Sequence, residues 1–230
     1  TASGEQFLSH ARNMLQEFRT AKNEIYELEH LSKGNIRFGI STYRGVYLLP
    51  DILRRFHSQY PGISVSITEK TSRQLEYEIL SGGLDMALLS LPLKILKDQD
   101  IHLRRTDEVK LICAPGHPIL KEAVTDPVSG TAGIPISAIG NYTFIFSPSD
   151  MALGYTARKL FHDFDVHPVS YPTELSPLLA TAVVRSSNAL AFSSAALSHL
   201  APELTYIPLL PGPYQVELGI VFSPQGVNSM

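Results

Sequence analysis

An uninterrupted heptad pattern of apolar residues near the start of the chain restricts its fold more than any other feature. The apolar positions follow one another at alternating steps of four and three residues: Phe7, Ala11, Met14, Phe18, Ala21, Ile25 and Leu28. This spacing keeps one narrow apolar stripe on a helix and is typical of a helix that pairs with a second helix. We therefore predict a dimerisation helix over residues 1–33, which ends before Gly34. The alternative is a long helix that packs against its own domain.

After Gly34 the pattern changes to short apolar strands that alternate with amphipathic helices. We expect strands over 36–41, 63–67 and 84–91, with helices over 46–60 and 71–82 between them. A second series follows, with strands over 109–114, 142–146, 189–192, 204–208 and 216–222 and helices over 151–164 and 175–184. Alternation of this kind is typical of an α/β fold with a parallel sheet. The two series predict two α/β lobes.

The composition excludes several classes of function. The 230 residues carry a formal net charge of −3, which leaves no basic surface of the kind that binds nucleic acid. No apolar run approaches the ~20 residues that a membrane span requires, so we expect no membrane partner. The single cysteine, Cys113, excludes an intrachain disulfide and suits a reducing compartment such as the cytoplasm. It lies in the apolar run 109–114, which predicts a buried, unreactive thiol.

Motifs for catalysis and metal binding are missing from the sequence. There is no G-x-S-x-G, no glycine-rich phosphate loop, no supported Cys–His pair and no H-E-x-x-H. His162 and His167 lie five residues apart without a further ligand nearby, so we predict no metal and no cofactor. We therefore predict that the protein is not an enzyme; an α/β transferase remains a weaker alternative that lacks a nucleophile and a base.

Hydroxyl-bearing residues follow the carboxyl ends of several predicted strands, where ligands of open parallel sheets lie. Hydroxyls and backbone amides at helix N-termini hold carboxylates or phosphates, although helix capping alone also explains each segment. Four such segments in two lobes predict a site for a small anion, with Arg44 and Arg73 as possible sources of charge. The candidate ligand-binding residues are Ser41, Thr42, Tyr43, Thr71, Ser72, Ser90, Phe146, Ser147 and Ser149, together with Thr173 and Glu174, which we expect to open the helix over 175–184. Glu174 could instead stabilise that helix terminus, and Tyr43 could stack on a ligand or pack internally.

Three stretches together resemble the LysR-type transcriptional regulators. TASGEQFLSHARNMLQEF resembles their linker helix, and residues 34–89 are similar to the start of their effector-binding domain. The motifs within the second stretch are L-P-x-x-L-x-x-F, at Leu49, Pro50, Leu53 and Phe56, and L-x-x-G-x-x-D, around Leu80, Gly83 and Asp85. The third stretch, LICAPGHPIL, matches a strand followed by His117-Pro118.

The resemblance implies a dimerising linker helix and an effector-binding domain of two lobes, like type II periplasmic binding proteins. The first lobe would take residues 34–114 and 216–230, and the second lobe residues 115–215. A small metabolite would bind in the cleft between them, with Ser193 at the cleft wall. A winged helix-turn-helix that binds DNA would precede the chain, the protein would be cytoplasmic, and the homodimer could associate into a homotetramer. The alternative function is a periplasmic solute-binding protein of a transporter.

The chain departs from the family pattern at one turn. Where the family has a glycine-rich turn before its last strand of the second lobe, this chain has Arg185-Ser186-Ser187-Asn188. Asn tolerates the left-handed conformation better than most residues, so we expect Asn188 to take the place of the glycine.

Overall fold

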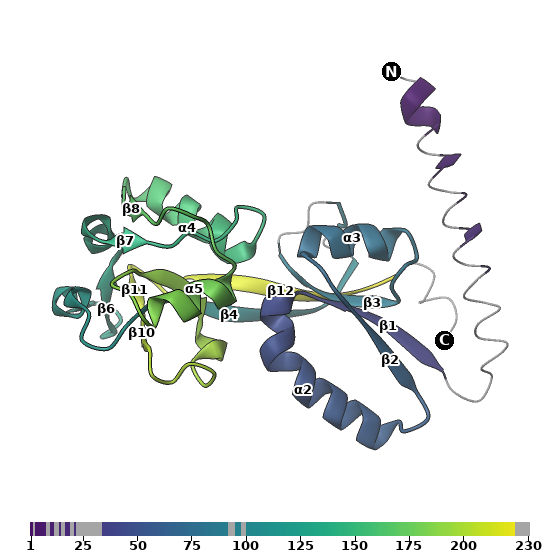
Figure 1. The fold of residues 1–230 in the computed structure, drawn as a ribbon, viewed down its shortest axis with the longest axis horizontal. Coiled ribbons are helices and arrows are strands. Elements are labelled where there is room, and N and C mark those ends of the chain that lie inside the picture. Colours follow the sequence, from purple (N-terminus) through teal and green to yellow (C-terminus); the bar gives the residue numbers. More distant parts are fainter. Residues whose placement is uncertain are drawn as a thin grey trace. The chain divides into compact units, whose positions relative to one another are not determined.

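The computed structural model describes residues 1, 3–7, 10–11, 14, 17–18, 21, 34–91, 95–97 and 100–223. The chain divides into two compact units, unit 1 (Thr1–Arg104 with Leu218–Met230) and unit 2 (Arg105–Glu217). It passes from one unit to the other within β4 (Ile101–Cys113) and again within β12 (Gln215–Phe222) (Figure 1). Each unit contains strands and helices in alternation, so the predicted α/β class is confirmed. The lobe boundaries at 115 and 215 stay a prediction.

Unit 1 is built from strand–helix–strand repeats. Its elements are β1 (Asn35–Ile40), α2 (Thr42–Gln59), β2 (Ser64–Glu69), α3 (Ser72–Leu80) and β3 (Met86–Ser90). β1 lies between β2 and β3 and is parallel to both, with Phe38 opposite Ile67 on one side and Met86 on the other. β12 pairs with β3 on its other side, in the antiparallel sense. Parallel neighbours require a crossover connection, which α2 and α3 supply.

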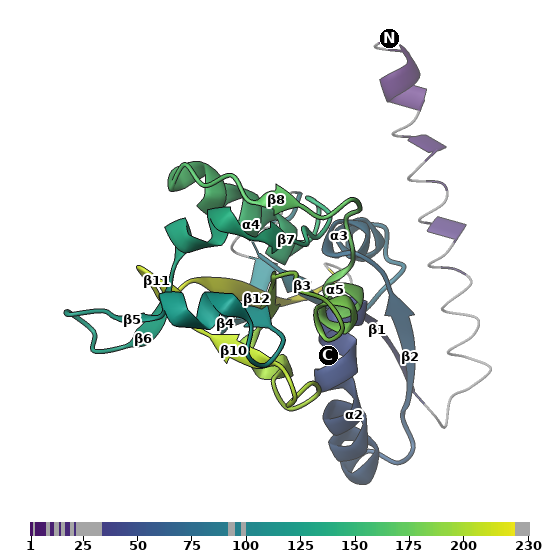
Figure 2. The ribbon, with the colours of Figure 1, turned by 60° about the vertical axis from the view of Figure 1, so that its left-hand side comes forward.

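The two helices cover opposite faces of this sheet (Figures 1 and 2). On one face, α3 packs Leu75 and Ile79 against Ala87 and Leu89 of β3. On the other face, Phe38, Ile40 and Leu88 pack with Leu48 and Leu49 of α2. Because successive strand residues point to opposite faces, strands that are covered on both sides become apolar at nearly every position. This explains the nearly continuous apolar run of β3.

An arginine and an aspartate lock the start of β3 to β1. The Asp85 carboxylate accepts a hydrogen bond from the Arg37 backbone N–H at 2.7 Å and pairs with the Arg37 guanidinium at 2.5 Å. The guanidinium also donates to the Gly82 carbonyl at 2.8 Å, and Gly82 itself has a positive φ of 68° after α3. A glycine ends the helix at this point because only glycine adopts that conformation without strain. The aspartate of the L-x-x-G-x-x-D motif therefore has a structural role.

Unit 2 has a more irregular set of elements. In chain order they are η2 (Pro118–Glu122), β5 (Val124–Thr125), β6 (Ala132–Pro135), η3 (Ile136–Asn141), β7 (Thr143–Phe144), α4 (Ala152–Asp163), β8 (Val169–Ser170), α5 (Pro177–Val184), β9 (Ala191–Ser194), η4 (Ala195–Leu197), β10 (Thr205–Ile207) and β11 (Leu209–Leu210). β9 and β10 both pair with β4 in the antiparallel sense, and β7 pairs with β8 in parallel. Two further short pairs join β6 to β5 and to β11.

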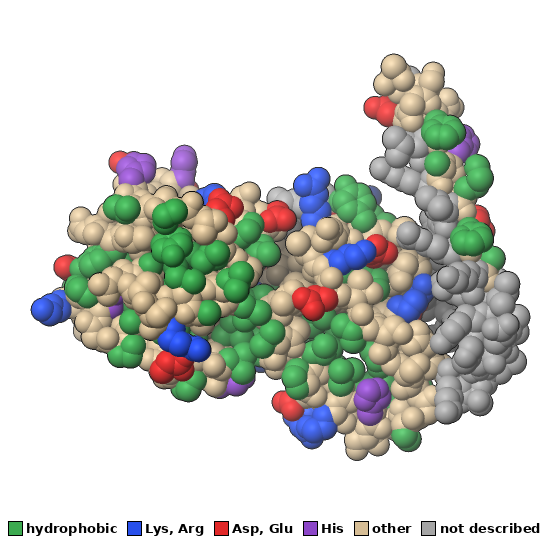
Figure 3. Space-filling view, viewed as in Figure 1, with side chains coloured by type: hydrophobic (Ala, Val, Ile, Leu, Met, Phe, Trp, Pro, Cys, Tyr) green, Lys and Arg blue, Asp and Glu red, His purple; other side chains and the backbone are tan. Residues whose placement is uncertain are grey.

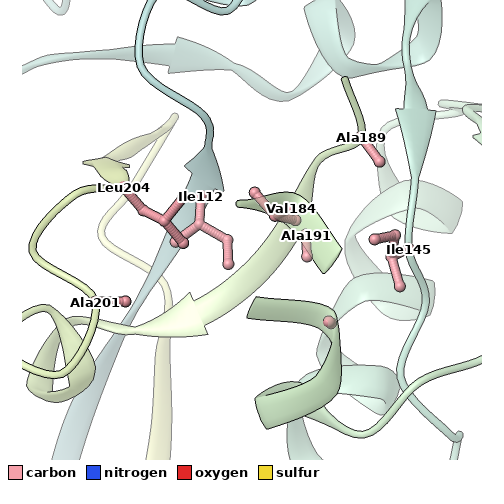
Figure 4. Packing of buried hydrophobic residues seen from close by; sticks show 8 residues of the cluster. Ile112, Ile145, Val184, Ala189, Ala191, Ala201 and Leu204 are labelled. Carbon is pink, nitrogen blue, oxygen red and sulfur yellow. The ribbon is translucent and has the colours of Figure 1, made fainter. Parts of the chain in front are cut away.

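Two groups of buried side chains form the core of unit 2. An aliphatic cluster brings together β4, α5 and β9 (Figure 4) and includes Ile112, Ile145, Val184, Ala191 and Leu204. An aromatic cluster packs edge to face, with Phe144 in contact with Phe146, Phe161 and Phe192 at centroid distances of 4.9–5.0 Å. Edge-to-face geometry within this distance range stabilises aromatic pairs beyond the area that they bury. Because Phe144 ends β7 and Phe146 follows it, their contact within the aromatic cluster holds the start of the segment after β7 in place.

The described residues of the N-terminal stretch, within 3–21, are helical. Three seam residues, Phe7, Met14 and Phe18, are 74%, 72% and 69% exposed, and hydrophobic side chains are visible on this segment (Figure 3). Ile25 and Leu28 lie outside the described residues. An apolar stripe that its own chain leaves uncovered is what a pairing helix presents, so the dimerisation seam stays a prediction that this exposure favours.

Three local expectations are wrong. β4 begins at Ile101 rather than at 109. Thr173 and Glu174 do not open the next helix, because α5 begins at Pro177 and Ser176 is its N-cap, a position where proline follows naturally. Asn188 is not left-handed, since Asp165 is the one non-glycine residue with positive φ in the described part of the chain. Instead, the Asn188 carbonyl lies 3.1 Å from Nε2 of buried His117.

Candidate functional site

In unit 1 the strand ends bring two of the predicted segments together. The Ser90 backbone N–H, at the end of β3, donates to Ser72 Oγ at 3.0 Å. Thr71 forms a capping box with Gln74, in which the Thr71 hydroxyl accepts from the Gln74 N–H. The hydroxyl of Thr71 therefore caps α3, while Ser72 and Ser90 form a polar corner of hydroxyl and amide groups.

The end of β1 presents a second polar segment in unit 1. Ser41 is the N-cap residue of α2 but makes no capping bond through its side chain, and the Thr42 hydroxyl donates to Glu69 at the end of β2. Arg44 follows in the first turn of α2 and is only 2% exposed. Its guanidinium donates to the Tyr47 hydroxyl at 2.8 Å and lies 5.1 Å from the Tyr43 ring centroid. The predicted charge at Arg44 is thus buried against tyrosine rings, whereas Arg73 is exposed.

In unit 2 the segment after β7 lies against the first turn of α4. A side chain at Gly154 would meet the carbonyl oxygens of Pro148 and Ser147 at 2.1 Å and 2.4 Å, so glycine is required for this close approach. Ser147 is 6% exposed, and among the described residues its hydroxyl has no hydrogen-bond partner. The hydroxyl is not among the fully enclosed polar atoms that lack a partner, so water reaches it, and a polar ligand can take the place of that water. Ser149 is exposed.

One arginine joins three of the predicted residues of unit 2. Arg158 Nη1 donates to the carbonyls of Ser147 at 2.7 Å and Gly154 at 2.9 Å. Arg158 Nη2 forms an ion pair with Glu174, and the guanidinium carbon lies 5.1 Å from the Phe146 ring centroid. The Phe146 carbonyl also accepts the Leu175 N–H at 3.0 Å, which holds the segment of Thr173 and Glu174 beside the end of β7.

Ser193 of β9 is fully buried and differs from the other candidates. It is hydrogen-bonded to Tyr206; burial raises the pKa of the Tyr206 hydroxyl, and the bond with Ser193 opposes that shift. Its neighbour Ser194 donates to Asp107 at 2.5 Å and caps η4 by accepting the Ala196 N–H. These contacts tie β4, β9 and β10 together.

The thiol of Cys113 is buried in β4, and this burial raises its pKa to about 11. The predicted burial of the thiol is therefore confirmed, and its raised pKa favours the predicted low reactivity. No group of three or more potential metal ligands occurs within the described ranges. Across these same ranges, none of the helices is both long and apolar enough to cross a membrane.

The geometry favours recognition of a small anion over covalent chemistry. Hydroxyls and backbone amides lie at strand ends of unit 1, and the partly exposed Arg158 lies at a strand end of unit 2. Groups of these kinds bind carboxylates or phosphates. Sequence reasoning missed the role of Arg158. Its position four residues after Gly154 places it one helical turn from the glycine, but no sequence pattern predicts its pairing with Glu174 sixteen residues later.

Comparisons with known proteins show which family the chain resembles. A family model described as the LysR substrate binding domain matches residues 29–229. The SDS degradation transcriptional activation protein of Pseudomonas sp. (strain ATCC 19151) is 30% identical over 123 residues, which cover 52% of this chain and 40% of that protein. This chain spans about two fifths of the length of the first curated relatives that it matches, from 39% to 41%.

Solved structures share the fold at low sequence identity. The regulatory domain of CcmR from Synechocystis PCC6803, in complex with 2-PG, has a TM-score of 0.67 at 18% identity and covers 83% of this chain and 88% of that chain. The effector-binding domain of QuiR, in complex with shikimate, has a TM-score of 0.67 at 16% identity and covers 84% of this chain and 88% of that chain. These likenesses confirm the predicted two-lobe fold of the periplasmic-binding-protein type. Since the family model matches most of its length, the chain belongs to the family of LysR substrate-binding domains.

Proposed function

We propose that this chain is the effector-sensing and dimerising region of a LysR-type transcriptional regulator, and that it binds a small organic acid at its strand ends. The family match over residues 29–229 carries the proposal. Groups of the kind that such an acid needs lie in each unit taken by itself, at Ser72 and Ser90 in unit 1 and at Ser147 in unit 2. Two relatives of the same fold are complexed with 2-PG and with shikimate.

A binding screen tests the proposed ligand class. Wild-type protein is titrated with benzoate, shikimate and other small carboxylates while thermal unfolding is followed by circular dichroism, because the chain contains no tryptophan. An acid present at 100 times its dissociation constant stabilises the fold by about 2.7 kcal/mol. For a chain of this size, that is a rise in melting temperature of about 5–11 °C.

A matched pair of variants distinguishes the site from general ionic effects. Ser147→Ala removes the hydroxyl and is expected to weaken binding several-fold, because the ligand loses one hydrogen bond of about 1 kcal/mol. Asp51→Asn changes an exposed residue of α2 and should leave binding unaltered. A flat response of the wild type to every acid would remove the organic-acid proposal.

We extend the proposal to assembly and DNA. The exposed seam of Phe7, Met14 and Phe18 pairs two chains, and a DNA-binding region of the whole regulator acts on the target gene in the cytoplasm. Burying one phenylalanine contributes about 1.5–3 kcal/mol, so Phe18→Glu, which acts twice in a dimer, should weaken pairing at least 100-fold. Gln6→Glu, off the seam, is the control. Sedimentation equilibrium measures the dimer dissociation constant of both variants and of wild type. A wild type that is monomeric at micromolar concentration would refute pairing through this helix.

The family match favours a regulator over the solute-binding protein of a transporter, the alternative considered from the sequence. The matched relative is a transcriptional activation protein rather than an enzyme. The gene that encodes the whole protein provides the discriminating observation. A basic winged helix-turn-helix ahead of this region supports the regulator, and a secretory signal there supports the transporter.

A further inference from the structure

We propose that Glu174 is an internal competitor that occupies Arg158 in place of the carboxylate of the effector, and that this exchange sets the affinity of unit 2 for organic acids. The inference rests on the proposed function, since it assigns to Arg158 the charge recognition of that same site. It concerns groups that belong to unit 2 alone, namely Arg158, Glu174, Ser147 and Phe146.

The position of the Arg158 guanidinium is fixed on one edge and open on the other. Both bonds to carbonyl oxygens, those of Ser147 and Gly154, come from Nη1, and the ring of Phe146 supports the guanidinium 5.1 Å from its centroid. Within the described part of the chain, Nε has no acceptor and Nη2 donates only to Glu174 Oε1. The fork formed by Nε and Nη2 is the edge that binds a carboxylate through two parallel hydrogen bonds.

Glu174 uses that edge incompletely. Its carboxylate contacts Arg158 through Oε1 alone and therefore binds in a monodentate manner. A free carboxylate that approaches the same edge can engage Nε and Nη2 together, which is the stronger arrangement. The exchange replaces one negative charge with another, so the buried carbonyl bonds of Nη1 need not change.

The energetics make displacement of Glu174 feasible. The side chains of Arg158 and Glu174 are 35% and 52% exposed, and ion pairs with this degree of exposure contribute only about 0–1 kcal/mol. A released Glu174 side chain returns to water with little penalty, and a ligand that also reaches the Ser147 hydroxyl gains a hydrogen bond to a group that has no protein partner among the described residues. Glu174 therefore lowers the affinity for acids without preventing their binding.

Four variants and two acids test this inference. Benzoate and shikimate are titrated by isothermal calorimetry at low salt into wild type, Glu174→Gln, Arg158→Met and the double variant. Glu174→Gln is expected to bind acids about fivefold tighter, equivalent to about 1 kcal/mol, because it removes the competing charge. Arg158→Met is expected to bind the acids at least tenfold more weakly than wild type. The double variant should bind them no tighter than Arg158→Met. Where Arg158→Met fails to fold, Arg158→Lys takes its place, because lysine keeps the charge but not the two-nitrogen fork. In the Arg158→Lys background, Glu174→Gln should no longer raise the affinity for acids.

A matched control lies on the same helix. Asp163 pairs with Lys159 one turn along α4, so Asp163→Asn removes one negative charge from an exposed ion pair of the same kind. Its affinity for acids should stay within twofold of wild type. Equal affinities of Glu174→Gln and wild type would overturn the inference, as would a gain that persists without Arg158. Because the wild-type titration alone tests the proposed function, failure of that function appears as a null result for wild type, Glu174→Gln and Asp163→Asn alike, which would remove both proposals.

Discussion

Removal of the Asp85 carboxylate should weaken unit 1 more than its partial exposure suggests. Asp85 accepts the Arg37 backbone N–H at 2.7 Å and receives the Arg37 guanidinium through Nε and Nη2. A substitution to alanine leaves a β1 backbone amide without its side-chain acceptor and frees a guanidinium that is still attached to Gly82. The backbone bond between Asp85 N–H and the Arg37 carbonyl remains, so the loss isolates the side-chain contribution.

The magnitude follows from two contributions. A hydrogen bond to a charged acceptor is worth about 1.5–3 kcal/mol when it is buried. The side chains of Arg37 and Asp85 are 26% and 36% exposed, so we take the lower end for the amide and add about 1 kcal/mol for the ion pair. Asp85→Ala should therefore cost about 2–3 kcal/mol. Asp85→Asn keeps an acceptor for the amide and should cost about 1 kcal/mol.

Hydrogen exchange of peptides from β1 and β3 measures the effect locally, which matters because two units can unfold separately. Urea unfolding followed by far-ultraviolet circular dichroism gives the global value. The control is Asp51→Ala, which breaks an ion pair with Arg54 whose two side chains are 69% exposed, and it should leave the free energy of unfolding nearly unchanged. If Asp85→Ala costs no more than Asp51→Ala, or if the Arg37→Ala and Asp85→Ala effects simply add, the proposed anchoring role is refuted.

Three further substitutions probe unit 2. Gly154→Ala places a methyl group 2.1 Å from the Pro148 carbonyl and should lower the melting temperature by about 6–12 °C through about 3 kcal/mol of overpacking, whereas Gly62→Ala, with open space around it, should change it little. His117→Phe removes the acceptor of the Ile119 N–H and the donor to the Asn188 carbonyl, and should cost about 2–4 kcal/mol in urea unfolding; an effect as small as that of exposed His167→Phe would contradict this. Burial raises the pKa of the Cys113 thiol to about 11, above its unfolded value of about 8.5, so the thiol stabilises the fold below pH ~8.5 and loses this effect as the pH rises through 11. Wild type should thus lose stability more steeply over that range than Cys113→Ala, and disulfide reagents at pH 8 should label Cys113 only after unfolding.

Local sequence rules predicted the elements of unit 1 well because neighbouring residues in the sequence determine where these helices and strands begin and end. The capping box of Thr71 and Gln74 marks the start of α3, and a glycine with positive φ marks its end. The apolar run of β3 reflects helices on both faces of the sheet. Elements of two residues, such as β5 and β11, are too short for any periodicity, so their strands depend on pairing with β6 and could not be predicted.

The sequence identified segments that carry candidate site residues, but it did not predict the contacts between those residues. The carboxyl-end rule selected Ser72 and Ser90 as separate segments. It did not predict that the Ser90 backbone N–H donates to Ser72 Oγ at 3.0 Å, which follows from the packing of α3 against β3. The pairing of Arg158 with Glu174 depends on how α4 and the segment before α5 both approach the end of β7. Residue types alone do not encode that approach, because an arginine on an amphipathic helix is equally compatible with solvent.

The turn at residues 185–188 shows why a missing glycine was a poor guide. A glycine in such a turn supplies positive φ, and Asn188 was expected to substitute for it. The structure closes the turn differently: buried His117 accepts the Ile119 N–H at Nδ1 and lies 3.1 Å from the Asn188 carbonyl at Nε2. An acceptor at Nδ1 and a donor at Nε2 define one neutral tautomer, so this histidine links η2 to the turn through two directed bonds. Together with the local bonds from Ser186 N–H to the Val183 carbonyl at 3.1 Å and from Ala189 N–H to Ser187 Oγ at 3.3 Å, the His117 contact holds this turn without a left-handed residue.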